Sequence, residues 1–347
     1  MAAKAWATAH DKDSKDKKAV DELFVSNQAV SLCLLVNRRA KTMRVIDFRA
    51  GPSEAKRKFV HALAKREGVE KMYTLVERDE VGTWAKLGFV KEGNIPGFYK
   101  RSDAFMLGCV PSTYVPPSEA VESQTRISVA PKKSRIEMAR LAMPDLDLAP
   151  PPPPDLSDDD DDDTGPVDTR AHDLAEKTLV HAKKRAKELA TKPAVSAKVA
   201  MISEAEAKKS VAAGLRAGRA LTAFEPFGRD FERRFFSVTA RGGFELVAST
   251  ESQSCFGNAF LELLTAPKND AEKVTYSAAL GALLSKLIAD GVASCFALCP
   301  SDDVAMATTM VANGFRRTGL LQSHLIVGSE RKDAMIFSRK LANPADE

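Results

Sequence analysis

Two carboxylates stand at similar points of two similar stretches of the chain. Asp47 and Glu262 each lie near the end of an apolar run, and each precedes a proline, Pro52 or Pro267, by five residues. A carboxylate so placed can take a proton from a bound substrate as a general base. It can equally be a solvated group on the outer face of a strand. The elements that hold the two residues decide between these roles.

The cysteines offer a second kind of chemistry. The chain has five cysteines, an odd number: Cys33, Cys109, Cys255, Cys295 and Cys299. Most of them lie in apolar, strand-like runs. Such a pattern predicts buried free thiols in a reducing compartment, and therefore a cytoplasmic protein. Cys295 and Cys299 would share one face of a strand, but no second Cys or His pair accompanies them. We therefore expect no metal site.

Both carboxylates belong to an internal repeat. Residues 43–107 and 258–340 each contain a strand, an amphipathic helix, a second strand and a second helix that ends in Gly-Phe. The shared positions are Gly68-Val69 and Gly291-Val292, Gly88-Phe89 and Gly314-Phe315, Gly93 and Gly319, and Asp103-Ala104 and Asp333-Ala334. Two copies with so long a period indicate two related domains rather than a solenoid.

Length and composition agree with two soluble domains. At roughly 150 residues per domain, 347 residues correspond to about two. The net charge of +4 is too near balance to indicate a nucleic-acid-binding protein. No apolar run approaches the ~18 residues of a membrane helix, and the N-terminus lacks the apolar core of a secretory signal. We expect residues 1–19 to be a disordered tail.

Strands that alternate with helices predict a mixed α/β sheet in residues 20–115 and again in residues 223–345. Between them, residues 116–169 form a linker rich in proline and aspartate, which cannot bury enough apolar area to fold. Its run Asp158–Asp163 predicts a solvated spacer that a protein partner could contact. The alternatives are a mimic of nucleic acid or a calcium site, but a calcium loop needs spaced ligands and a glycine turn.

Residues 170–222 are rich in alanine and lysine and predict a basic helical segment. RNA or membrane contact is the alternative interpretation. The segment lacks the interleaved aromatics that stack on bases, and its apolar face is poor for membrane insertion. We therefore expect partners of neither class.

The repeat resembles the C-terminal half of the GNAT N-acetyltransferase superfamily. The resemblance is carried by the stretch from Trp84 to Met106, with its Gly-Phe step and closing strands, and by the stretch from Met310 to Ile336. It covers about 70 residues in each half. It implies two GNAT-like domains in tandem, the first without the family's early helices. It also implies acetyl-CoA as cosubstrate, bound where the two central parallel strands part.

The resemblance also implies site residues. Asp47 and Glu262 would be bases, and Tyr99 an acid for the leaving thiolate, because Trp84 and Met310 replace the family's usual tyrosine. Tyr73, Tyr276 and His324 are alternative acids. The pyrophosphate would lie on backbone amides where the next helix begins. The matching residues are Arg49, Gly51 and Ser53 in the first half and Ala266, Lys268, Asn269 and Asp270 in the second. Both loops depart from the family's glycine pattern.

Two functions follow from the resemblance. The first is an acyl-CoA-dependent N-acyltransferase that acts on a small-molecule or protein amine, with the second, more complete domain as the active one. The alternative is a catalytically degenerate GNAT-like protein that binds or regulates a partner. Stabilisation by acetyl-CoA discriminates between them.

Overall fold

The computed structural model describes residues 20–26, 30–47, 51–99, 102–114, 169–193, 195–219, 232–241, 244–253, 257–327 and 330–341. The chain divides into two units, of which one comprises residues 1–113 and 167–347 and the other residues 114–166. The predicted tail 1–19 and the predicted linker, up to residue 168, lie outside the described residues. All of the described strands and helices belong to the first unit.

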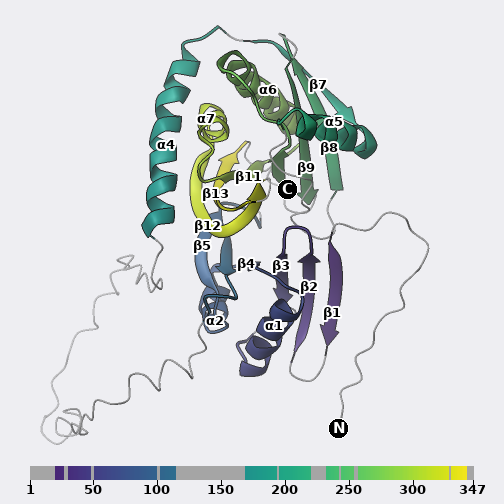
Figure 1. The fold of residues 1–347 in the computed structure, drawn as a ribbon, viewed down its shortest axis with the longest axis vertical. Coiled ribbons are helices and arrows are strands. Elements are labelled where there is room, and N and C mark those ends of the chain that lie inside the picture. Colours follow the sequence, from purple (N-terminus) through teal and green to yellow (C-terminus); the bar gives the residue numbers. More distant parts are fainter. Residues whose placement is uncertain are drawn as a thin grey trace, which may run out of the picture. The chain divides into compact units, whose positions relative to one another are not determined.

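Thirteen strands form one mixed sheet in the described part of the chain, and seven helical segments accompany them (Figure 1). The strands are β1 (Asp21–Ser26), β2 (Ser31–Asn37), β3 (Thr42–Asp47), β4 (Lys71–Val76), β5 (Val90–Ile95), β6 (Ala104–Cys109), β7 (Ala197–Ile202), β8 (Glu232–Ala240), β9 (Glu245–Gln253), β10 (Asn258–Leu263), β11 (Ser294–Pro300), β12 (Arg316–Val327) and β13 (Glu330–Lys340). The helices are α1 (Glu54–Arg66), the 3₁₀ turn η1 (Arg78–Glu80), α2 (Val81–Ala85), α4 (Thr169–Ala190), α5 (Glu204–Arg216), α6 (Asp270–Ala289) and α7 (Val304–Ala312).

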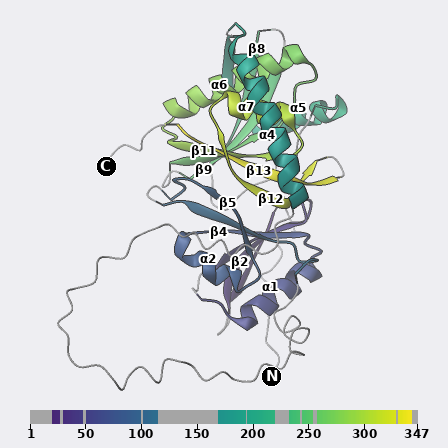
Figure 2. The same cartoon turned by 90° about the vertical axis from the view of Figure 1, so that its left-hand side faces the viewer.

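The order of the strands is the same in the two halves of the sheet when each half is followed from its outer edge toward the centre, apart from the additional edge strand β7. It runs β1-β2-β3-β4-β6-β5 and continues as β12-β13-β11-β10-β9-β8, with β7 added at the far edge. Strands β8 to β13 therefore repeat β1 to β6 in reverse spatial order. The two halves meet between β5 and β12, which pair antiparallel, as a pseudo-twofold axis requires. Figure 2 shows the two halves stacked along the long axis.

The predicted pair of glycines lies on this axis. Gly93 of β5 is the register partner of Gly319 of β12. A Cβ atom added to Gly93 would lie 2.6 Å from the Cα atom of Gly319 and 2.8 Å from a methyl group of Ile336. Only glycine allows the two backbones to approach this closely.

The repeat extends to a turn that both halves build in the same way. In the first half Gly97, at φ +65°, donates its N–H to the Asp103 carboxylate at 2.8 Å. In the second half Ser323, at φ +48°, donates its N–H to Asp333 at 2.7 Å. Each positive-φ residue stands four positions after the axial glycine of its own half. The shared Gly and Asp-Ala positions therefore mark equivalent backbone.

Helices α1 and α6 occupy the place of the amphipathic helix predicted in each half. Ser53 caps α1, and the helix buries Val60 and Leu63 and ends before Gly68, which has φ +65°. Asn269 caps α6, which begins at Asp270. Each helix begins where a side-chain oxygen accepts a backbone N–H group and ends near a glycine.

The basic segment 170–222 is not helical throughout. It contains α4 and α5, but Ala197–Ile202 between them forms β7, which pairs antiparallel with β8 at the edge of the sheet. The buried residues Ala207 and Val211 of α5 pack in a small core with Phe235 and Val247. Lysine and alanine gave this stretch a helical composition, whereas the strand forms because β8 offers it an edge.

Two cores lie on opposite faces of the sheet. In the second half α6 and α7 cover one face, where Leu261, Leu263, Leu280 and Met310 belong to one buried cluster. We call the face turned away from α1, α6 and α7 the inner face. Residues of both halves form one cluster on it: Tyr73, Leu75, Ile95, Phe98, Ala104 and Met106 with Phe260, Phe296, Leu298, Leu321, Ala334 and Ile336.

Candidate functional site

In both halves the two central parallel strands part after three residue pairs. Strands β3 and β4 pair from Thr42 to Arg44, and β10 and β11 pair from Asn258 to Phe260. Both first strands continue for three more residues beyond the last pair. In the first half the Thr74 hydroxyl donates to the Val45 carbonyl at 2.8 Å, just beyond the last pair. The parallel pairing therefore ends after three residue pairs in both halves, and in the first half a side-chain hydrogen bond still joins the two strands beyond that point.

The two carboxylates do not occupy equivalent positions, contrary to the sequence-based prediction. The first parallel pair is Thr42–Lys71 in one half and Asn258–Ser294 in the other, which makes Asp47 equivalent to Leu263. Glu262 therefore lies one residue before the position in β10 that corresponds to Asp47 in β3. Because side chains alternate along a strand, the two carboxylates face opposite sides of the sheet.

Asp47 points to the α1 side and forms an ion pair with Lys56. The exposed fractions of the two side chains are 8% for Asp47 and 3% for Lys56, so the pair is shielded from solvent. The Lys56 ammonium also donates to the Gly51 carbonyl at 2.8 Å. The pair thereby ties the end of β3, the following loop and the first turn of α1 together.

Glu262 lies on the inner face in a network of charges. Its Oε2 atom is 3.2 Å from Arg233 Nη2 and accepts a hydrogen bond from the Ser249 hydroxyl at 3.0 Å. Arg233 also lies 3.5 Å from Glu251, whose side chain is 3% exposed. The Arg233 guanidinium therefore lies near two buried carboxylates. Glu262 is therefore held by its partners, and it could accept a proton from a substrate only after Arg233 and Ser249 rearrange.

The network reaches across to the first half. Burial lowers the pKa of Arg44, while Tyr73, Tyr99 and Glu251 act in the opposite direction. The influence of Glu251 places a carboxylate of the second half near a cation of the first. Tyr99 therefore shares its surroundings with Arg44 on the inner face. Asp47, on the α1 side, is separated from this group by the sheet.

Tyr99 follows β5 in the turn toward β6. Its ring contacts Phe98 edge-on, with the ring centroids 4.9 Å apart. Burial raises the pKa of Tyr99 to about 12, so the phenol stays protonated at neutral pH. The raised pKa makes this phenol a weaker acid than an ordinary tyrosine, which counts against Tyr99 as the donor to a thiolate. The Phe98 carbonyl accepts a hydrogen bond from Asn258 Nδ2 at 2.5 Å, which fixes the turn against β10.

The alternative acids lie in less suitable places. Tyr276 belongs to α6 and is fully buried, with its ring against Phe244, and burial raises its pKa well above the usual range. Tyr73 and His324 pack against each other with centroids 4.9 Å apart. Burial, with Lys71 nearby, lowers the pKa of His324 to about 3. His324 is therefore uncharged at neutral pH and cannot act as an imidazolium acid.

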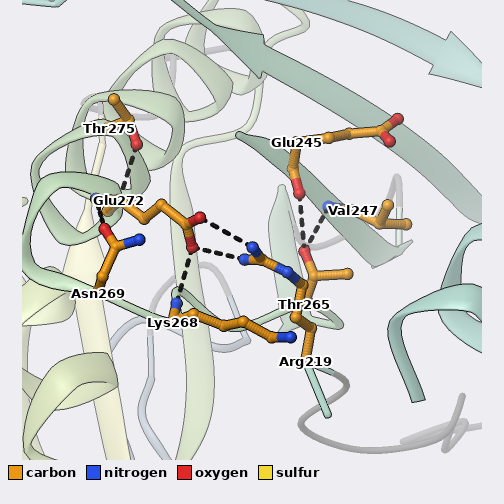
Figure 3. Close-up of polar contacts among 8 residues, drawn as sticks. All are labelled: Arg219, Glu245, Val247, Thr265, Lys268, Asn269, Glu272 and Thr275. Carbon is orange, nitrogen blue, oxygen red and sulfur yellow. Dashed lines mark hydrogen bonds and ion pairs between the residues drawn. The ribbon is translucent and has the colours of Figure 1, made fainter. Parts of the chain in front are cut away.

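Near the start of α6 several backbone amides have partners within the chain, two of them drawn in Figure 3. The Lys268 N–H donates to Glu272 Oε2 at 2.7 Å, and the Glu272 N–H donates to the Asn269 side chain at 2.9 Å. The Ala266 N–H donates to the Arg219 carbonyl at 2.6 Å. Three amides that precede or open the helix therefore have partners within the chain.

Glu272 and Arg219 form the strongest ion pair of this end. The two guanidinium nitrogens of Arg219 lie 2.5 and 2.8 Å from the two carboxylate oxygens of Glu272. The Arg219 guanidinium and the Lys268 amide hold the pKa of Glu272 at about 2. Asp270, the remaining predicted ligand of this loop, pairs with Lys273 at 2.6 Å. Two anions of the chain itself therefore stand at the positive end of α6.

The start of α1 is built differently. Gly51 has φ +111°, which favours glycine, and the Ser53 hydroxyl accepts the Lys56 N–H at 3.0 Å. The predicted ligand Arg49 lies outside the described residues. The structure thus places Gly51 and Asp47 at the ammonium of Lys56 and the Ser53 hydroxyl at its backbone amide.

Sequence reasoning missed four residues of these sites. Asn269 and Glu272 match the spacing of a capping box, which could have indicated that the carboxylate folds back on the helix start. Lys56 interrupts the basic outer face of α1 with a buried position, and Arg219 and Arg233 are distant in sequence from the carboxylates they meet. No local pattern announces such pairs.

Other kinds of site find little support among the described residues. No group of three or more His, Cys, Asp or Glu side chains in them is placed to hold a metal ion. None of their helices is long and apolar enough to cross a membrane. Four cysteines are buried free thiols, and Cys255 lies outside the described residues.

Solved structures of N-acetyltransferases align with part of the chain. The ribosomal-protein-alanine N-acetyltransferase from Escherichia coli is 16% identical, with a TM-score of 0.34, over 44% of this chain and 98% of that one. A variant of the spermidine N-acetyltransferase from Vibrio cholerae is 11% identical, with a TM-score of 0.35, over 43% of this chain and 96% of that one. No protein-family profile and no curated protein matches the sequence.

Proposed function

We propose that the chain is an acyl-CoA-dependent N-acyltransferase of the GNAT type, built from two GNAT-like halves in tandem. One observation carries the proposal: β3 and β4, and again β10 and β11, pair for three residues and then part. Beyond the last pair the two strands no longer pair with each other, although the Val45 carbonyl is held by the Thr74 hydroxyl. We infer that the remaining backbone groups of the parted strands are open to a ligand. An extended pantetheine arm that bears amide groups can pair with them as an added strand.

The proposed reaction moves an acyl group from sulfur to nitrogen. A base removes a proton from the acceptor ammonium, the amine lone pair attacks the thioester carbonyl, and the C–S bond breaks as the C–N bond is kept. The departing thiolate then takes a proton. The family resemblance makes Tyr99 the candidate acid and Glu262 or Asp47 the candidate base, although the raised pKa of Tyr99 counts against it. Either carboxylate would first have to loosen its ion pair with Arg233 or Lys56.

A degenerate GNAT-like protein that binds a ligand or partner is the second candidate. The observation that favours it is the start of α6, where Glu272 already accepts the Lys268 amide. A fold can keep its shape after its chemistry is lost. In that case a partner amine or protein would bind without acyl transfer. The predicted protein contact at the acidic run Asp158–Asp163 and the cytoplasmic location stay predictions in both cases.

Acetyl-CoA binding and turnover test the proposal together. A ligand at about 100 times its Kd stabilises a folded protein by roughly 2.7 kcal/mol, which a thermal shift detects. Release of free CoA thiol in the presence of a panel of primary amines reports turnover. Stabilisation with turnover supports the acyltransferase, stabilisation without turnover on any amine supports the degenerate binder, and the absence of both contradicts the proposed cosubstrate.

A further inference from the structure

The first strands of the two halves, β1 and β8, have related sequences. When the halves are matched by strand register, β1 reads Asp-Glu-Leu-Phe-Val-Ser, and the matching residues 232–237 of β8 read Glu-Arg-Arg-Phe-Phe-Ser. Phe24 of β1 therefore corresponds to Phe235 of β8. Because residues paired across a sheet lie on the same face, both phenylalanines lie on the inner face, as Glu262 does.

In the second half this phenylalanine is covered. Strand β7 pairs antiparallel with β8 and places Ile202 directly opposite Phe235. Helix α5, which follows β7, contributes Ala207 and Val211 to the same small core. Phe235 is only 5% exposed as a result. The segment from β7 to α5 thus covers the outer edge of the second half.

The first half has no counterpart of β7 or α5 within the part of the chain that the structure describes. Strand β1 is the last strand of the sheet on its side, and Phe24 is 59% exposed. A strand edge and a large apolar side chain that are covered in one half but open in the other indicate an interaction surface. The second half also shows what fits it, namely an antiparallel strand with an apolar side chain opposite the phenylalanine.

We propose that the strand that fits this edge is β1 of a second copy, so that the chain forms a twofold dimer through its two β1 edges. An antiparallel pair centred on Phe24 places Phe24 opposite Phe24 of the partner subunit. It places Leu23 opposite Val25 and Glu22 opposite Ser26 in the same way. Each apolar side chain then meets another apolar side chain, as Phe235 meets Ile202, and no two like charges face each other.

The twofold arrangement is favoured over pairing with the other edge of the sheet. The outer side of β7 is the second edge of the sheet in the described chain. If β1 of one copy paired with β7 of the next, each pair would leave further edges open and copies would add without limit. Two β1 edges instead close on each other. The contact involves only six residues of each strand, and small interfaces, below roughly 1,200 Å², are typically weak, so we expect a dimer that depends on concentration.

Sedimentation equilibrium of the full chain from micromolar to millimolar concentration tests the proposal. We expect a monomer–dimer equilibrium that two matched substitutions at the exposed Ser26 move in opposite directions. Ser26→Lys places an ammonium opposite Glu22 of the partner subunit, and Ser26→Glu places a carboxylate there. The dimer dissociation constant of Ser26→Glu should exceed that of Ser26→Lys by roughly fivefold or more at low ionic strength, and salt should narrow the difference. Equal constants would overturn the pairing about Phe24.

A substitution on the twofold axis gives a second measurement. Phe24→Lys sets two ammonium groups against each other and should weaken the dimer by roughly tenfold or more. Met201→Lys, at a 71% exposed position of β7, is the control and should leave the dimer unchanged. A chain that stays monomeric at every concentration would overturn the proposal. So would a dimer that Met201→Lys weakens and Phe24→Lys does not. Melting curves check that the variants fold, and the Ser26 pair decides if Phe24→Lys does not.

Discussion

His324 gives the fold a dependence on pH that one substitution should remove. Burial, with Lys71 and Arg331 nearby, lowers the pKa of His324 from 6.5 to about 3, and its side chain is 7% exposed. The unfolded chain therefore binds a proton below pH 6.5 that the folded chain refuses. Stability supplied by the neutral imidazole is complete above this pH and is lost as the pH falls toward 3.

The size of the loss follows from the two pKa values. At pH 5 the solution lies about 1.5 pH units below the pKa of the histidine in the unfolded chain. At about 1.36 kcal/mol per unit, protonation stabilises the unfolded chain by about 2 kcal/mol. The result depends little on the folded pKa, because pH 5 lies well above it. His324 occupies the position of Phe98 in the other half, since each directly follows the positive-φ residue of its turn, Ser323 or Gly97. His324→Phe therefore removes the titrating group and introduces the side chain that the repeat itself uses.

Urea unfolding of both proteins at pH 7 and pH 5 measures the effect. We expect the wild-type chain to lose about 2 kcal/mol more of its unfolding free energy than His324→Phe over this interval. Each protein is compared with itself at the two pH values. The difference between the two losses therefore cancels the contributions of the other titrating groups and any change in packing that the substitution causes. Equal losses in the two proteins would refute the reasoning and mean that His324 is not held neutral.

Other perturbations have equally definite outcomes. Gly93→Ala places a methyl group 2.6 Å from the Gly319 backbone and should destabilise the chain by more than the roughly 1–3 kcal/mol of ordinary overpacking. Gly82→Ala, in a helix with open space around it, should be neutral or stabilising. Urea unfolding measures both effects. Glu262→Gln should abolish acyl transfer if Glu262 is the base, with acetyl-CoA affinity unchanged in a calorimetric titration, and full activity would exclude this role. Thiol labelling at pH 8 should reach all five cysteines in urea but at most one in the native chain, because four are buried; rapid labelling of two or more would contradict the buried positions.

Local patterns predicted the repeat because its markers are local constraints. Gly93 and Gly319 were visible as spaced glycines, and the structure shows why only glycine fits. The caps Ser53 and Asn269 likewise fix where α1 and α6 begin. Such residues report on backbone conformation at their own positions, and a sequence records this directly.

The pairing of the two carboxylates failed because it was counted from prolines. Pro52 directly precedes the cap of α1, but Pro267 stands two residues before the cap Asn269. Counting from the caps makes Asp47 equivalent to Leu263, as the strand register does. One residue suffices to move a side chain to the other face of a sheet.

Long-range partners could not be read from the sequence. Arg219 meets Glu272 across 53 positions, and β7 forms only because the edge of β8 receives it. Lys56 and Glu272 could be read at matching positions, but their partners Asp47 and Arg219 could not. Tertiary contacts decide these features, and a short window of sequence does not contain them.

Acetyl-CoA binding, measured by titration calorimetry on the full chain, tests the central claim most directly. Parallel strands that part in both halves predict saturable binding of acetyl-CoA. No binding at millimolar acetyl-CoA would contradict the claim that the parted strands receive an acyl-CoA at all.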